Sequence, residues 1–99
     1  MKTAYIDLIK HALGLGCTIS VWDGGAWQVK RSTSYKAIKD AIESVEEAQL
    51  RIRDSEGNNI GWALVIPYGV EPDETVADFS GEFVYTWWDK FSPQFVYDF

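Results

Sequence analysis

The chain has 99 residues, enough for one small domain, and its net charge of −6 argues against non-specific binding to nucleic acids or membrane surfaces. Hydrophobic residues make up 46% of it and aromatic residues 15%, so we expect a folded protein with one core. The single cysteine excludes an internal disulfide, and no segment approaches the roughly twenty apolar residues of a membrane span, which favours a cytoplasmic protein.

The first predicted helix starts after Thr3, which can cap it, and stops at Gly14 or Gly16. Its apolar residues recur at i, i+3, i+4, i+7 and i+8, which is the stripe of a helix that rests on a core. These residues are Tyr5, Leu8, Ile9, Ala12 and Leu13.

Residues 17–22 and 26–31 are predicted to form a β-hairpin with a three-residue loop. The expected register pairs Trp22 with Ala26, Val21 with Trp27 and Ile19 with Val29. It places Trp27 on the core side of the hairpin and Trp22 and Lys30 on the other side. A two-residue loop would mix apolar and polar residues on both sides, so we favour the longer one.

A second helix is predicted to follow Ser34, which can cap it. Its expected buried stripe comprises Tyr35, Ile38, Ala41, Ile42 and Val45. Two oppositely charged pairs, Lys36 with Asp40 and Lys39 with Glu43, have i, i+4 spacing on the outer side of this helix.

Residues 48–54 alternate between apolar and polar side chains, which is typical of a half-buried strand. A turn leads into a fourth strand over residues 60–66, which has almost no polar residue and should lie centrally in the sheet. The expected register pairs Leu50 with Leu64, Ile52 with Trp62 and Asp54 with Ile60.

In the C-terminal third, Pro72 is followed by acidic residues, which is typical of a helix start. This pattern predicts a short helical turn through Phe79. A firmer helix is predicted after Ser80. Its apolar stripe is Val84, Trp87, Trp88 and Phe91. Residues 94–99 could form an extended tail that docks through its aromatic side chains.

These elements predict one α+β domain over residues 1–99, in the order α-β-β-α-β-β-α. Two β-hairpins would build a four-stranded, mostly antiparallel sheet, with the helices packed on one face. The strand order and the oligomeric state stay open.

Catalytic and metal-binding motifs are missing from the sequence. His11 is the single histidine, and no neighbour in sequence would lower the pKa of Cys17. Asp73, Glu74 and Asp78 could in principle bind Mg²⁺ or act as acids and bases, but acid clusters in small domains are more often solvated faces. We therefore expect a protein that is not an enzyme and that needs no metal or cofactor.

Acidic residues gather in the second half, where nine of them stand against one base from Asp54 onward. Such a surface could imitate the phosphates of a duplex and occupy the basic groove of a partner protein. Aromatic residues beside the acids would anchor the contact. The residues predicted to bind the partner are Glu71, Asp73, Glu74, Asp78, Glu82, Trp88 and Asp89.

An alternative binding surface is the polar face of the predicted sheet. A basic, partly aromatic sheet can bind single-stranded nucleic acid through phosphate contacts and base stacking. The residues assigned to this surface are Trp22, Lys30, Arg51 and Arg53. With a single aromatic residue placed there, the acidic surface is the preferred prediction.

Four stretches carry a resemblance: 18–32 (TISVWDGGAWQVKRS), 44–54 (SVEEAQLRIRD), 61–65 (GWALV) and 72–78 (PDETVAD). Over roughly residues 5–90 the chain resembles a family of small uncharacterised acidic proteins of tailed bacteriophages. The family brings no activity or site residue with it. Because small acidic phage proteins are often inhibitors, the resemblance implies a host-enzyme or host-defence inhibitor of the anti-CRISPR or anti-restriction type, in the cytoplasm of an infected bacterium.

Overall fold

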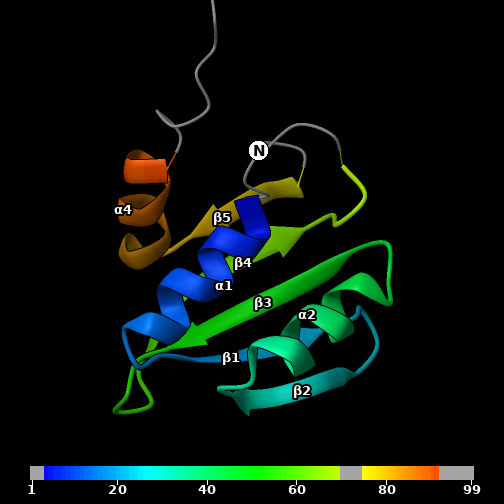
Figure 1. The fold of residues 1–99 in the computed structure, drawn as a ribbon, viewed down its shortest axis with the longest axis horizontal. Coiled ribbons are helices and arrows are strands. Elements are labelled where there is room, and N and C mark those ends of the chain that lie inside the picture. The colour runs from blue at the N-terminus through cyan, green and yellow to red at the C-terminus, as the bar shows by residue number, and fades with distance from the viewer. Residues whose placement is uncertain (1–3, 70–74, 92–99) are drawn as a thin grey trace, which may run out of the picture.

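The computed structural model of the protein describes residues 4–69 and 75–91, which form three helices and one five-stranded antiparallel sheet (Figure 1). In chain order the elements are α1 (Ala4–Gly14), β1 (Thr18–Trp22), β2 (Trp27–Ser32), α2 (Tyr35–Glu43), β3 (Ala48–Arg53), β4 (Asn59–Val65), β5 (Val76–Ser80) and α4 (Glu82–Phe91). The strand order is β2-β1-β3-β4-β5. The α+β class is confirmed, and the sheet has one strand more than predicted.

The additional strand, β5, corrects the last part of the predicted helical turn, from Val76 to Phe79. Residues 70–74, with Pro72, lie outside the described part of the chain, but Val76–Ser80 pairs antiparallel with β4. The acids after Pro72 resemble a helix start, yet the apolar strand β4 needs a hydrogen-bonding neighbour on its second edge. That tertiary requirement decides the conformation of this segment.

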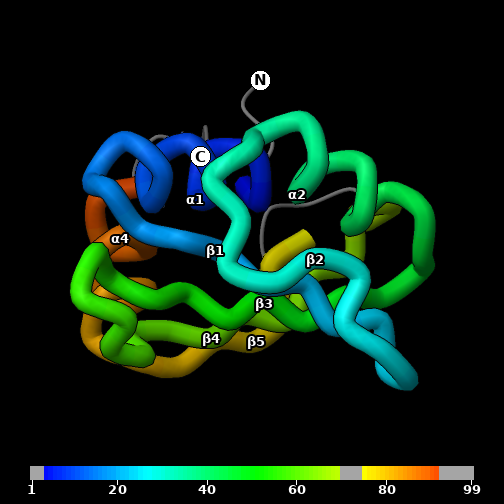
Figure 2. Tube along the Cα trace, turned by 90° about the horizontal axis from the view of Figure 1, so that it is seen from below, coloured from blue at the N-terminus to red at the C-terminus, as the bar shows by residue number. Residues whose placement is uncertain are grey.

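All three helices pack on the same face of the sheet. Figure 2 shows α1 and α2 on one side of the strands, and Val84 of α4 contacts this side at Gly61 of β4. A Cβ atom at Gly61 would lie 2.6 Å from Cγ2 of Val84, so the glycine allows α4 to approach the sheet closely. The helices therefore cover one face and leave the other without a helix in the described chain.

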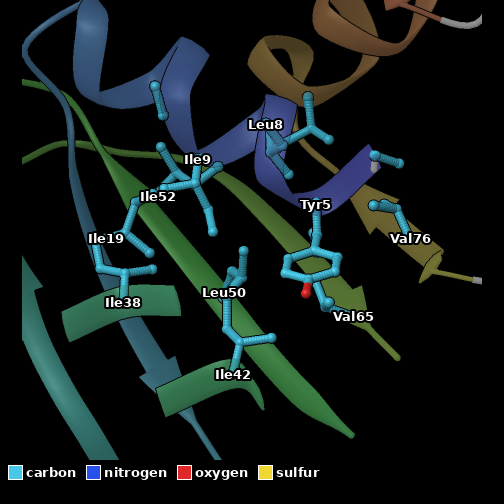
Figure 3. Packing of buried hydrophobic residues seen from close by; sticks show 14 of the residues in the cluster. Tyr5, Leu8, Ile9, Ile19, Ile38, Ile42, Leu50, Ile52, Val65 and Val76 are labelled. Carbon is cyan, nitrogen blue, oxygen red and sulfur yellow. The ribbon is translucent and has the colours of Figure 1, made fainter. Parts of the chain in front are cut away.

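The hydrophobic core lies between the helices and the sheet. In Figure 3, Leu8 and Ile9 of α1 and Ile42 of α2 point toward the strands, where Leu50 and Ile52 of β3 meet them. All of these side chains are fully buried. The apolar stripes predicted for the helices are thus confirmed as the core-facing sides, which is where the hydrophobic effect stabilises the fold.

Specific polar contacts support the helix layer. Ser34 caps α2 as predicted, because its Oγ accepts a hydrogen bond of 3.2 Å from the N–H of Ala37. Both predicted charge pairs of α2 form, at 2.8 Å each. The indole N–H of Trp87 donates to a carboxylate oxygen of Asp7 at 2.8 Å and ties α4 to α1. The predicted cap Thr3 lies outside the described residues.

The β1–β2 hairpin has a different register from the predicted one. Trp22 pairs with Trp27, Val21 with Val29 and Ile19 with Ser32. The N–H of Asp23 donates to the carbonyl of Ala26 at 3.0 Å, so this hydrogen bond encloses Gly24 and Gly25 alone, and the predicted three-residue loop is wrong. The shift moves Trp27 away from the core side and places it beside Trp22.

The β3–β4 register also differs from the prediction, by one residue. Trp62 pairs with Arg51 instead of Ile52, and Ile52 pairs with Gly61. A bulge near the turn, where Arg53 pairs with Asn59, inserts one extra residue into β4. Because side chains alternate along a strand, a shift of one residue turns Trp62 to the face opposite the helices.

None of the described helices has the length and apolarity needed to span a bilayer. The predicted tail, residues 94–99, lies outside the described part of the chain.

Candidate functional site

The sheet face opposite the helices, called the open face below, carries the candidate site. Val21, Leu50 and Ile52 are buried against the helices, so their strand neighbours project from the open face. The residues assigned to this face by alternation and pairing are Trp22, Trp27, Gln49, Arg51, Arg53 and Trp62. They come from four adjacent strands, β2, β1, β3 and β4.

A hollow of about 310 Å³ lies on the open face. It is lined by Trp22, Trp27, Gln49, Leu50, Arg51 and Trp62. Its volume is at the lower end of the range of roughly 300–1,000 Å³ that small-molecule sites occupy. The hollow is therefore suited to one planar or small cyclic group at a time.

Three of the five tryptophans of the chain surround this hollow. The rings of Trp22 and Trp27 meet edge to face, with centroids 5.1 Å apart and planes at 68°. Trp27 remains 40% exposed, and Trp22, Trp27 and Trp62 all lie outside the hydrophobic core cluster. Core packing thus does not account for three large aromatic side chains on one polar sheet face.

The loop of the β1–β2 hairpin positions two of these rings. The carboxylate of Asp23 accepts backbone hydrogen bonds from Gly25 at 2.8 Å and Ala26 at 2.7 Å, and a further one from the amide of Gln28. These hydrogen bonds lower the pKa of Asp23 below its usual value, and the bond from the N–H of Gly25 has the largest effect. The same turn places Trp27 opposite Trp22.

Gln49 is held in one orientation inside the hollow. The indole N–H of Trp62 donates to its Oε1 at 3.2 Å. An indole nitrogen can only donate, so the amide oxygen must face Trp62 and the NH₂ group must face away from it. Gln49 therefore lines the hollow with its two N–H donors turned away from Trp62.

Two arginines extend the polar part of the face along β3. Arg51 lines the hollow, and Arg53 follows two residues later on the same face. One guanidinium N–H of Arg53 donates to the carbonyl of Gly57 at 3.2 Å, while its buried Nε has no hydrogen-bond partner among the described atoms. Lys30 is exposed on the edge strand β2 and does not line the hollow.

Two of the four residues predicted for the open face meet at the hollow, whereas Lys30 and Arg53 do not line it. Trp22 and Arg51 both line the hollow, as the assignment to one surface requires. Trp27 and Trp62 were missed because both predicted registers were wrong. A usable signal was present in β4, where the small or core-forming residues at 61, 63 and 65 leave Trp62 to the opposite face.

The described acidic residues of the C-terminal third lie on two elements. Asp78 is exposed on β5 opposite Leu64, whereas Glu82 and Asp89 are exposed on α4 and seven residues apart, which places them on one side of that helix. Trp88 is half-buried, with its ring centroid 5.7 Å from that of Phe79, and belongs to the aromatic packing beneath α4. Glu71, Asp73 and Glu74 lie outside the described residues.

His11 and Cys17, considered above as catalytic candidates, have structural surroundings. The ring of His11 packs 5.5 Å from that of Phe83, and Cys17 is buried. Burial raises the pKa of the Cys17 thiol, which opposes the thiolate form that a nucleophile needs. Within residues 4–69 and 75–91, no group of three side chains is arranged to hold a metal ion.

Comparison with known proteins gave no match to any protein-family model, curated protein or solved structure.

Proposed function

We propose that the protein is a non-enzymatic binding protein whose open face takes up a short single-stranded segment of nucleic acid. The observation that carries this proposal is the grouping of three tryptophans and Arg51 around one hollow outside the core. Aromatic rings offer stacking surfaces for bases, and arginine side chains pair with phosphates. Rings for base stacking and a side chain for phosphate binding thus lie on neighbouring strands.

A single strand fits this face better than a duplex. The bases of a duplex are stacked and paired, so they cannot enter a hollow of about 310 Å³ on a sheet. The overall charge of −6 also opposes a long polyanion. Binding should therefore involve few phosphates, be favoured at low salt and depend on stacking.

The salt dependence of binding tests this proposal. Fluorescence anisotropy of a labelled single-stranded oligonucleotide should show binding at low salt, with an affinity that falls as salt rises. Each phosphate contact contributes about −0.7 to the slope of log K against log salt, so Arg51→Gln and Arg53→Gln should each reduce the steepness by about that amount.

The control for this experiment is Lys36→Gln, which removes one positive charge from an exposed position of α2 on the helix side. It should leave the slope unchanged. An absence of binding at low salt, or equal effects of the arginine and lysine variants, would contradict the proposal.

A second candidate function is the blocking of a basic partner protein by the acidic side of α4. The supporting observation is that Glu82 and Asp89 are both exposed on one side of this helix. In the context that the bacteriophage resemblance implies, the partner is a host nucleic-acid-handling or defence protein. Such a partner would be attracted by negative charge at the place where it otherwise holds phosphates.

Charge reversal tests this second candidate. The wild-type protein, immobilised, should retain a protein from bacterial lysate that short duplex DNA then displaces, and Glu82→Lys combined with Asp89→Lys should abolish retention. Glu46→Lys with Glu47→Lys is the matched control, because it changes the net charge equally at two exposed residues before β3. Equal retention by both double variants would refute an acidic docking side on α4.

A further inference from the structure

We infer that Gln49 gives the open face a preference for pyrimidine bases with a carbonyl group at C4, thymine and uracil, over cytosine, which has an amino group there. This inference rests on the proposed single-strand binding and specifies which bases the hollow takes. It follows from the hydrogen-bonding character of the side chains that surround the hollow.

The polar side-chain groups at the hollow are almost all donors. Tryptophan N–H and arginine guanidinium groups have no acceptor atom. Among the described residues that line the hollow, the amide oxygen of Gln49 is the only side-chain acceptor, and it already receives the indole N–H of Trp62 at 3.2 Å. A ligand in this hollow is therefore offered the Gln49 NH₂ group and the Arg51 guanidinium.

Bases differ in the hydrogen-bonding groups that they present to such a set of donors. Thymine and uracil carry a carbonyl oxygen at both C2 and C4 and so present an acceptor at either end of the base edge, whereas cytosine has a carbonyl at C2 but an amino group at C4. An amino group facing the Gln49 NH₂ would leave donors opposed to each other and unpaired, which costs binding free energy. Thymine and cytosine have the same ring but also differ in the C5-methyl group and at N3, so a variant of Gln49 is needed to attribute the difference in affinity to this side chain.

The orientation of Gln49 makes the inference specific to this side chain. A free glutamine could rotate its amide and offer an oxygen to cytosine instead. Here the rotation would place the NH₂ group against the Trp62 N–H, donor against donor. Trp62 thus acts on base choice by positioning Gln49, in addition to offering a ring for stacking.

The test compares labelled oligo(dT) and oligo(dC) of equal length in low salt. The wild-type protein should bind oligo(dT) about threefold to tenfold more tightly, the effect of one hydrogen bond gained or lost. Gln49→Glu keeps an oxygen toward Trp62 and replaces the NH₂ donors by an acceptor, so the ratio of the two affinities should fall to one or reverse.

Because Gln49→Glu also adds a negative charge, Ser55→Glu serves as the control at an exposed turn residue outside the hollow. It should weaken both complexes equally and leave their ratio unchanged. Equal affinity of the wild type for both oligonucleotides, or an unchanged ratio in Gln49→Glu, would overturn the role of Gln49 while single-strand binding stands. Failure of the wild type to bind any single strand would instead remove the proposed function and this inference with it.

Discussion

Gly81→Ala is expected to destabilise the protein by about 2–5 kcal/mol, because it combines an unfavourable backbone conformation with steric overlap. Gly81 lies between β5 and α4 with a φ of +93°, which residues with a side chain rarely adopt. A Cβ atom there would lie 2.6 Å from the carbonyl oxygen of Ile60 and 2.8 Å from Cα of Gly61. Both contacts are to backbone atoms of β4, which cannot rotate away.

The same junction starts the last helix. The carbonyl of Gly81 accepts hydrogen bonds of 3.1 Å from the N–H groups of Val84 and Tyr85. A shift of the backbone at this residue would therefore disturb both the β4–β5 pairing and the first turn of α4. Because small domains have total stabilities of roughly 5–15 kcal/mol, the loss should be a large part of the whole.

Urea denaturation followed by tryptophan fluorescence measures this effect, with Gly14→Ala as the matched control. Gly14 is the last residue of α1, and no atom lies within 4 Å of the place where its Cβ would be. Alanine there should change the free energy of unfolding by no more than about 1 kcal/mol, in the stabilising direction. Similar denaturation midpoints for the two variants would show that the β5–α4 junction is not as described.

The helices could be predicted from the sequence because their signals are local. The apolar stripe of α1 and the Ser34 cap of α2 depend on residues within a few positions of each other. The start of α4 after Ser80 was likewise found, because acidic and basic residues lie at its expected ends. In each case neighbouring residues carry the information that determines the element.

The strand registers could not be derived in the same way, and they determine the candidate site. In the β1–β2 hairpin, the turn closes around Gly24 and Gly25, and a register shift between Val21 and Trp22 then pairs Val21 with Val29, which the alternating pattern alone does not indicate. In β4, one bulge residue decides which face receives Trp62. The pairing differs from the predicted one by one residue in β3–β4 and by one to three residues in β1–β2, and in each case a tryptophan moves to the opposite side of the sheet.

The positions of the charged residues in the fold also could not be predicted from local sequence patterns. The sequence indicates that acids are concentrated in the C-terminal third, but it does not show that Asp78 and Glu82 lie on different elements, one on a strand and one on a helix. Conversely, Trp22 and Arg51 are 29 positions apart in sequence and line one hollow because β1 and β3 are adjacent. Adjacency in a sheet depends on strand order, which local patterns do not specify.

Trp62→Ala is expected to weaken binding of single-stranded nucleic acid by about fivefold to 150-fold, which corresponds to the 1–3 kcal/mol that base stacking on an aromatic residue contributes. The side chain lines the hollow but lies outside the hydrophobic core cluster, so the free energy of unfolding should change less than for a core tryptophan such as Trp87. Anisotropy titrations and urea denaturation of the same sample separate the two effects.

Tyr85→Ala provides the aromatic control, since Tyr85 is 53% exposed on α4 and does not line the hollow. It should leave the affinity for nucleic acid unchanged. Equal losses in Trp62→Ala and Tyr85→Ala would mean that the open face is not the binding surface.

Trp62→Phe then distinguishes the two roles assigned to Trp62. Phenylalanine retains a ring for stacking but has no N–H to hold the amide oxygen of Gln49. Most of the affinity should therefore remain, while the preference for oligo(dT) over oligo(dC) should disappear because the Gln49 amide can rotate. If Trp62→Phe instead loses affinity and keeps its preference for oligo(dT), the Trp62 N–H does not position Gln49 for base selection. Base selection would then have to come from Arg51 or from the remaining tryptophans.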